Sequence, residues 1–375
     1  MSDYSKENMF NVQMIEELAA RMVAVHESFP AERFIEMASE GLEPLELKAR
    51  SAHIREALRA NLPEEIEDAI ALLVASMVAD GDDGTGGVEG VRGFRHMPAL
   101  DFVAAYGLEH PELSLDAIET MTLYFSAEFA IRPFIRRYPE VTMARMLEWA
   151  EASDWRLRRL ASEGSRPRLP WAKQLSAFIE DPSTTVEILD LLYDDSSLTV
   201  RRSAANHLND ISRDNPDVTI EVARRWMEDA SEGAAWTVKH ALRTLVKKGN
   251  ADALAILGFA GGDAVEVEDF SLEPPEVKLG EEVTFSFSLT LAEEEEEEVS
   301  LVVDYALHRA LKNDRVGRKV FKLGKLDLSP GATATFEKKH AFKQLSTRTY
   351  YAGEHKIEIL INGRSAGIWS FDVVE

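Results

Sequence analysis

The sequence contains no cysteine among its 375 residues. A disulfide, a thiolate zinc site, an iron–sulfur cluster and a cysteine nucleophile are therefore excluded. Long apolar runs are also missing: none approaches the roughly 20 residues that a membrane-spanning helix needs. The first residues, MSDYSKENMF, contain no basic leader followed by an apolar core. We therefore expect a protein of the cytoplasm that has no signal peptide and no contact with a membrane.

Basic residues are outnumbered as well: 42 Lys and Arg stand against 66 Asp and Glu, which gives a net charge of −24. Such a balance ordinarily argues against a polyanionic partner. The acidic residues are concentrated, however, in residues 1–91 and in the run Glu293–Glu298. Two short segments are basic instead, Trp155–Lys173 with six Lys and Arg and His308–Lys325 with seven. This asymmetry indicates that any polyanion would meet the chain at two places.

The pattern of apolar residues is helical from about Met9 to Leu257, with steps of three and four residues. Ser153-Asp154, Asp181-Pro182-Ser183 and Asn215-Pro216-Asp217 each offer a capping side chain, and the last two add a proline suited to a helix start. The glycine-rich stretch Gly81–Gly93 follows no clear strand, so we interpret it as a plain loop and not as a phosphate-binding loop.

Three segments of the helical region align with one another: LRRLASEG from Leu157, VRRSAANHL from Val200 and VKHALRTLV from Val238. Their starts lie 43 and 38 residues apart, and second helices alternate with them. Paired helices at about 40 residues are typical of a HEAT-like solenoid, whose units stack into a curved array with one concave surface. Aligned basic residues would form a stripe along that surface.

The period of the pattern changes to two from Val265 onward, where seven strand-like runs occupy the rest of the chain. Asn362-Gly363 is a strong signal for a two-residue hairpin turn. We predict an antiparallel β-sandwich of immunoglobulin-like type, in which Glu293–Glu298 forms a solvated loop. The expected fold is thus multidomain: an all-α HEAT-like solenoid over residues 1–262, followed by an all-β immunoglobulin-like sandwich over residues 263–375.

The first basic segment combines arginines with a tryptophan. Arg156 and Arg159 share one helical face, and a short loop limited by prolines then displays Arg166 and Arg168 before Trp171. Arginine forks next to an aromatic ring suit phosphate binding. The alternative is an ordinary solenoid surface with ion pairs and a tryptophan that packs against the next repeat.

Three blocks of this chain resemble one known family. RRLASEGSRPRLPWA, the upstream SAEFAIRPFIRRYPE and the downstream VRRSAANHLNDISRDNPD are similar to the DNA alkylation repair glycosylases of the AlkC branch. This is a HEAT-repeat family related to AlkD, and some members carry a C-terminal immunoglobulin-like domain. The resemblance covers essentially the whole chain.

The resemblance implies a bacterial, cytoplasmic enzyme, associated with the nucleoid when bound to DNA. Its partner would be double-stranded DNA with alkylated bases. It would hydrolyse the N-glycosidic bond of cationic bases such as 3-methyladenine and 3-methylcytosine without extruding the base into a pocket. By the same resemblance, Glu128, Glu163 and Asp210 take the positions of the catalytic carboxylates and Trp171 that of the active-site tryptophan. Residues that hold the DNA backbone correspond to Arg159 and Arg166.

The chemistry favours these residue types independently. A cationic base is already an activated leaving group, and positive charge develops on the deoxyribose, where fixed carboxylates stabilise it. An indole face can do the same. Each acid also has an ordinary alternative, an ion pair about one helical turn away: Glu128 with Arg132, Glu163 with Arg159 and Asp210 with Arg213.

Further contacts with DNA are expected from Arg202, which with Asn206 could continue the phosphate stripe, and from a basic hairpin with a turn near Asn313-Asp314. A solvated helix face and a lysine-protected edge strand are the alternatives. The candidate DNA-binding residues are Arg156, Arg159, Arg166, Arg168, Arg202, Lys312, Arg315 and Arg318.

The histidines, including His207 and His240, have no metal-ligand spacing, so we expect no metal site. We also expect that the protein uses no cofactor and is a monomer. Two other functions stay open. One is a HEAT-repeat scaffold that binds a protein partner through its acidic N-terminal helices, and the other is a DNA-damage binder without catalytic activity.

Overall fold

The computed structural model describes residues 9–80, 93–228, 230–312, 315–343 and 349–375. The chain forms two compact units, residues 1–215 with 230–241 and residues 216–229 with 242–375. Helices fill the chain up to Ile256 and strands begin at Val265, so the change from helices to strands lies inside the second unit. The predicted glycine-rich loop, apart from Gly93, and the predicted turn at Asn313-Asp314 fall outside the described residues.

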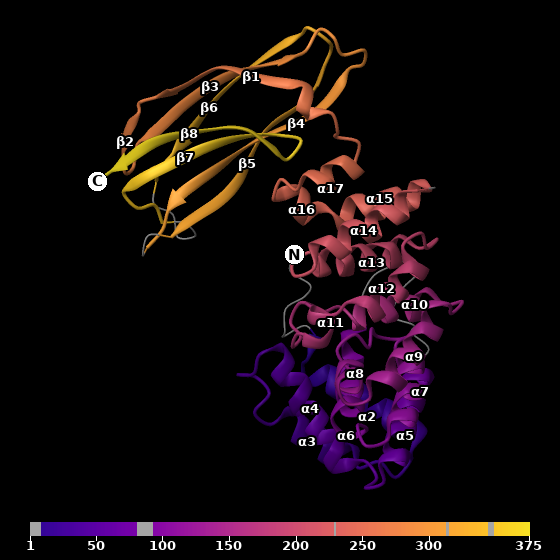
Figure 1. Cartoon of the computed structure of the whole chain (residues 1–375). Helices are drawn as coiled ribbons and strands as arrows, with labels where there is room; N and C mark the ends of the chain where they lie inside the picture. Colours follow the sequence, from indigo (N-terminus) through magenta and orange to yellow (C-terminus); the bar gives the residue numbers. More distant parts are fainter. Residues whose placement is uncertain (1–8, 81–92, 229, 313–314, 344–348) are drawn as a thin grey trace. The chain divides into compact units, whose positions relative to one another are not determined.

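The first unit is built of helices that stack along the chain (Figure 1). Their amphipathic sequences bury one face each, as in α2, where Met14, Ile15, Leu18 and Met22 are buried. The helices are α2 (Val12–Val25), α3 (Ala31–Ser39), α4 (Leu47–Asn61), α5 (Ile66–Asp80), α6 (Met97–Tyr106), α7 (Pro111–Met121), α8 (Arg132–Arg137), α9 (Pro139–Ala150), α10 (Trp155–Gly164), α11 (Ser176–Glu180), α12 (Ser183–Leu192), α13 (Leu198–Ile211) and α15 (Glu232–Ala241).

The three aligned segments become stacked helices. The first lies in α10 and the second in α13, and α10 packs against α13 as α13 packs against α15. The third segment is divided, because α15 ends at Ala241 and α16 begins at Arg243. The predicted helix starts are confirmed: Asp154 caps α10 by accepting a hydrogen bond from the Arg156 amide at 2.8 Å, and α12 and α14 begin at Ser183 and Pro216.

The second unit combines α14 (Pro216–Met227), α16 (Arg243–Lys247) and α17 (Ala251–Ile256) with two β-sheets. One sheet has the strand order β1-β3-β6 and the other β2-β8-β7-β4-β5. The strands are β1 (Val265–Glu273), β2 (Glu276–Lys278), β3 (Glu282–Leu291), β4 (Val299–Ala310), β5 (Val316–Leu328), β6 (Thr333–Ala341), β7 (Gly353–Ile361) and β8 (Arg364–Val374).

Alternating side chains of the two sheets form one apolar core. β3 buries every second residue, including Phe285 and Phe287, and these side chains belong to the same cluster as Tyr305, Ile357 and Phe371 of the other sheet. The seven predicted runs are all strands, and Glu293–Glu298 forms the exposed loop between β3 and β4. The sequence did not predict the short β2, which pairs in parallel with β8, whereas the other strand pairs are antiparallel.

The hairpin turn at the end of the chain is confirmed. Ile361 and Arg364 face each other in the β7–β8 pair, and the two residues between them form the turn. Asn362 has φ 47° and Gly363 φ 79°, the left-handed values that a type I′ turn requires at both central positions.

Candidate active site

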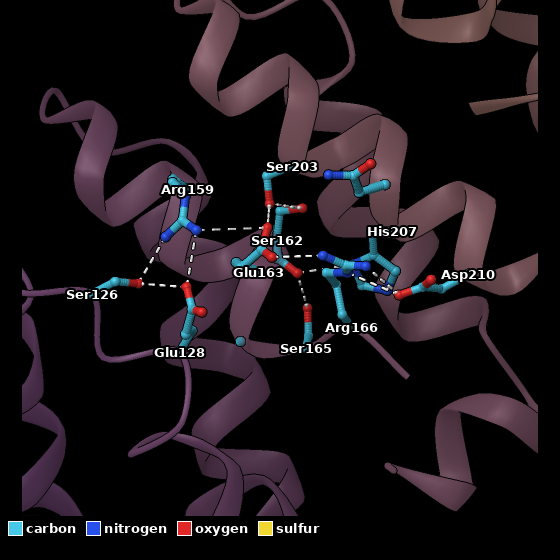
Figure 2. Close-up of polar contacts among 12 residues, drawn as sticks. Ser126, Glu128, Arg159, Ser162, Glu163, Ser165, Arg166, Ser203, His207 and Asp210 are labelled. Carbon is cyan, nitrogen blue, oxygen red and sulfur yellow. Dashed lines mark hydrogen bonds and ion pairs between the residues drawn. The ribbon is translucent and has the colours of Figure 1, made fainter. Parts of the chain in front are cut away.

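Glu163, the second-last residue of α10, has both carboxylate oxygens occupied. Its Oε1 accepts a hydrogen bond from Arg166 Nη1 at 2.6 Å, and its Oε2 accepts one from Ser203 Oγ of α13 at 2.5 Å (Figure 2). Only 7% of the residue is exposed. A buried carboxylate with two donors and a guanidinium in contact is held in one orientation as an anion.

Asp210 lies near the C-terminal end of α13 and is also buried. Its Oδ2 lies 2.8 Å from both Nε and Nη2 of Arg166. Arg166 therefore binds two acids from stacked helices, Glu163 of α10 and Asp210 of α13 (Figure 2). Among the residues that the structure describes, Oδ1 of Asp210 has no hydrogen-bonding partner, so this oxygen is available to a water molecule or a ligand.

The two acids differ in their affinity for a proton. Burial raises the pKa of Asp210, and although Arg166 opposes this shift, the pKa stays above its ordinary value. Burial would also raise the pKa of Glu163, but the charges of Arg159 and Arg166 and the hydrogen bond from Ser203 hold it below its ordinary value. Glu163 is thus the more persistent anion, and Asp210 is the carboxylate that more readily takes up a proton.

Glu128 joins this network through a second arginine. Its Oε2 accepts hydrogen bonds from Ser126 Oγ and from Arg159 Nη2, each at 2.9 Å, and Arg159 Nη1 donates to Ser126 Oγ at 2.7 Å. Arg159 Nη2 also lies 4.0 Å from Oε2 of Glu163. The three acids and two arginines form a continuous chain, which we call the carboxylate chain: Glu128, Arg159, Glu163, Arg166 and Asp210 (Figure 2).

The carboxylate chain replaces two of the three local pairs that the sequence offered. Arg132 does not bind Glu128, because its Nη1 donates to the carbonyls of Gly164 and Arg166 at 2.9 and 2.8 Å. The carboxylate of Asp210 is paired with Arg166 and not with Arg213, whose exposed side chain acts on it through its charge. The charges of Arg132 and Arg213 also act on these acids. The carboxylates are nonetheless the groups that would stabilise a cation held beside them.

Trp171 lies in the loop between α10 and α11, and its side chain is not packed against the next repeat. The residue is 75% exposed and has φ 63°, and its carbonyl accepts a hydrogen bond from Lys48 Nζ. The structure brings Glu128, Glu163 and Asp210 together through their ion pairs, while the indole of Trp171 faces solvent.

The candidate phosphate-binding arginines have different surroundings. Arg166 was expected on display in a loop, but it is only 7% exposed and is enclosed by its two acids. Arg156 binds Asp154 and the Leu123 carbonyl, and Arg168 binds the Asp214 carboxylate through two nitrogens at 2.7 and 2.8 Å. Arg202 is exposed on α13. The assignment of these residues to DNA stays a prediction.

Known proteins are similar to this chain over nearly its whole length. The family model for the C-terminal Ig-like domain of the uncharacterised protein YhaZ matches residues 266–375. The chain is 34% identical over 366 residues to the uncharacterized protein YhaZ of Bacillus subtilis. The match covers 97% of this chain and 98% of that protein. It also matches the structure of Pseudomonas fluorescens alkylpurine DNA glycosylase AlkC bound to DNA containing an abasic site analog, with a TM-score of 0.83, 34% identity and 99% coverage of both chains. The chain belongs to the AlkC family.

Membership of the AlkC family confirms the resemblance read from the three sequence blocks and the order of a helical region followed by an immunoglobulin-like domain. In this AlkC-family chain the second basic segment forms the β4–β5 hairpin, where His308 faces Arg318. Lys312, Arg315 and Arg318 are exposed, and Arg318 Nε also binds Oε2 of Glu358 at 2.9 Å.

The described residues contain no group of three or more His, Asp or Glu placed to hold a metal ion. No helix in the same ranges is long and apolar enough to cross a membrane.

Sequence reasoning missed two residues of α13 that contact the C-terminal part of α10 at the candidate site. Ser203 donates to Glu163, and His207 Nδ1 lies 2.9 Å from the carbonyl of Ser162. His207 is completely buried, and burial lowers its pKa to about 3, so the imidazole is neutral. Neither residue type is unusual in a helix, and only the stacking of α10 on α13 shows what they contact.

Proposed function

We propose that this AlkC-family protein is a DNA glycosylase of base excision repair. It would hydrolyse the N-glycosidic bond of cationic alkylated bases, 3-methyladenine and 3-methylcytosine, in double-stranded DNA without extruding the base. The observation that carries this proposal is the buried carboxylate chain, with an oxygen of Asp210 left available. Its support is the match over 99% of the chain to an alkylpurine DNA glycosylase.

The reaction needs little help at the leaving group. An alkylated base that carries a positive charge departs as a neutral molecule, so no general acid has to protonate it. The positive charge moves to the deoxyribose, whose C1′ and ring oxygen become oxocarbenium-like in the transition state. Buried carboxylates of fixed geometry beside the sugar stabilise that cation more than they stabilise the ground state.

The surroundings of the acids suggest a division of labour. Glu163 has two donors on its oxygens and a lowered pKa, so it serves as a permanent negative charge. Asp210 keeps Oδ1 for a water molecule, and its raised pKa makes it the better acceptor of that water's proton as the oxygen bonds to C1′. Glu128 adds negative charge from the other end of the carboxylate chain. The products are the free base and an abasic site.

Double-stranded DNA would be held by exposed cations at two places. Arg202 on α13 and the hairpin residues Lys312 and Arg315 are exposed and suited to phosphates. Other arginines, such as Arg158 and Arg168, are paired with acids and are therefore less suited to bind phosphates. The proposed enzyme acts as a monomer in the cytoplasm and uses neither a metal nor a cofactor.

The test is release of the base. Purified protein is incubated with DNA treated with a methylating agent, and free 3-methyladenine and 3-methylcytosine are measured by chromatography against a sample without protein. We expect both bases to be released faster than in the sample without protein. Binding to methylated duplex without release would indicate a damage binder instead, and the absence of salt-dependent DNA binding would favour a scaffold for a protein partner.

A further inference from the structure

The loop that carries Trp171 has an unusual backbone. It joins α10 to α11, and Trp171 has φ 63°, a left-handed value that few residues other than glycine adopt. The indole is 75% exposed, so no packing of the ring explains this conformation. A residue in such a region persists only where neighbouring groups hold it.

Two arginines of α8 bind the backbone of this loop. Arg132 Nη1 donates to the carbonyl of Arg166 at 2.8 Å, and its Nη2 donates to the carbonyl of Lys173 at 2.7 Å. Arg136 Nη2 donates to the same Lys173 carbonyl at 3.0 Å. Arg132 is buried, and burial lowers its pKa to about 10. Both ends of the loop are therefore fixed by charged donors, whose hydrogen bonds are stronger than neutral ones.

A third cation binds the loop at Trp171 itself and comes from a distant part of the chain. Lys48 of α4, 123 residues earlier, donates from Nζ to the Trp171 carbonyl. The same ammonium lies 4.5 Å from the ring centroid of Phe129, the residue that follows Glu128. Lys48 thus connects the segment that carries Glu128 with the segment that carries Trp171.

The start of α4 is itself fixed, which makes Lys48 a firm anchor. Arg50, two residues further along, donates from Nη1 to the Phe10 carbonyl at 2.6 Å and from Nη2 to the Glu43 carbonyl at 2.7 Å. Arg50 is buried, whereas Lys48 is exposed. A substitution of Lys48 should consequently disturb the loop without unfolding the helix.

We propose that Lys48 is a positioning residue for the proposed glycosylase reaction. It holds the backbone of Trp171 against the Glu128–Phe129 segment, so that the exposed indole is presented to DNA in one orientation. This inference rests on the proposed function, because it takes the indole as part of the active site. It also gives the acidic N-terminal helices a role in the reaction: they supply the cation that holds the loop.

The test is a double-mutant cycle of Lys48→Met and Trp171→Ala, read as single-turnover base release at saturating protein. A misplaced active-site group costs up to about a hundredfold, and we expect Lys48→Met to slow release by about tenfold. The affinity for DNA should stay unchanged. In the Trp171→Ala background, Lys48→Met should slow release less than about twofold, because the two residues act as one unit. Equal slowing in both backgrounds, or a loss of affinity at an unchanged rate, would overturn the proposal.

Two further variants separate position from charge. Lys48→Arg retains a cationic donor and should restore most of the rate. Lys278→Met removes an exposed lysine from β2 and is the matched control, expected to release base like the wild type. A rate for Lys48→Arg as low as that of Lys48→Met would contradict the positioning role.

Limited trypsin digestion tests the clamp without any reference to activity. The loop contains Arg168 and Lys173, after which trypsin can cleave once the backbone is released. We expect Lys48→Met to be cut after these residues faster than the wild type or Lys278→Met. Unchanged cleavage would overturn the clamp even if base is released, whereas faster cleavage without base release by the wild type would leave the clamp and reject the proposed function.

Discussion

Arg166 and Asp210 are 44 residues apart in the chain, yet Nε and Nη2 of the arginine both lie 2.8 Å from Oδ2 of the aspartate. The arginine follows α10 and the aspartate lies in α13, so this ion pair links the end of α10 to the helix stacked on it. Because the same guanidinium also binds Glu163, it is the shared counter-charge of two buried acids. The geometry of the candidate active site therefore depends on one side chain.

Replacement of Arg166 should destabilise the helical unit. Arg166→Met leaves Glu163 and Asp210 buried without their common partner, and breaking a buried pair costs about 3–5 kcal/mol. Arg168→Met is the matched control, because its pair with Asp214 is far more exposed and should be worth less than about 1 kcal/mol. Urea unfolding followed by circular dichroism measures both. An equal loss of unfolding free energy in the two variants would show that the carboxylate chain is not a structural unit.

The stability of the same region should depend on His207 at mildly acidic pH. The pKa of this imidazole is lowered by burial from 6.5 to about 3. Below pH 6.5 the unfolded chain binds a proton that the folded chain does not, so the free energy of unfolding falls as pH decreases toward 3. The slope from this one group reaches about 1.4 kcal/mol per pH unit.

Hydrogen exchange of the α10 and α13 amides between pH 6.5 and 4.5, corrected for the intrinsic exchange rate, measures this slope. We expect His207→Gln to flatten it, since the amide can still donate to the Ser162 carbonyl but does not titrate. His110→Gln, which replaces an exposed imidazole, should keep the slope. A slope that persists in His207→Gln would contradict the assignment.

Arg202 is expected to contact a DNA phosphate. Arg202→Ala should weaken binding to all duplexes alike and reduce the slope of log K against log salt by about one. Arg224→Ala is the control, since it removes an exposed arginine of α14 that is paired with Asp252 at 2.5 Å. Fluorescence anisotropy of a labelled duplex over a range of salt concentrations gives both slopes. The same change in both variants would mean that only net charge matters.

The β4–β5 hairpin is expected to make a second, separate contact. The double variant Lys312→Ala/Arg315→Ala should reduce the salt slope by about two. Lys338→Ala/Lys343→Ala changes the net charge equally on exposed residues in and just after β6, a strand of the other sheet, and should leave the slope near that of the wild type. If the hairpin variant binds DNA with an unaltered slope, the hairpin serves another purpose, such as protection of the edge strand β5.

The sequence predicted those parts of the structure that depend on neighbouring residues. The Asp154 cap, the Asn362-Gly363 turn and the alternation of β3 are local, so each was visible in a few residues. The strand β2 has only three residues and pairs with β8 nearly a hundred residues later, which no local pattern could reveal.

The site shows the same limit. The sequence identified Glu128, Glu163 and Asp210 through the family resemblance, but local spacing suggested partners within one turn. The partner of Asp210 comes instead from the adjacent helix pair, because the register of α10 against α13 decides which side chains meet. For the same reason Ser203 and His207 could not be singled out, and Arg166 could not be known to be buried.

Single-turnover release of 3-methyladenine and 3-methylcytosine shows whether the buried carboxylates catalyse hydrolysis of the glycosidic bond. The wild type is compared with Glu163→Gln/Asp210→Asn, after circular dichroism shows that both are folded. We predict that the wild type releases base and that the double variant is at least about a hundredfold slower, since removal of one such electrostatic group costs about 2–4 kcal/mol of barrier. Equal release by both proteins would contradict the role of these acids, and no release by either would contradict the glycosylase itself.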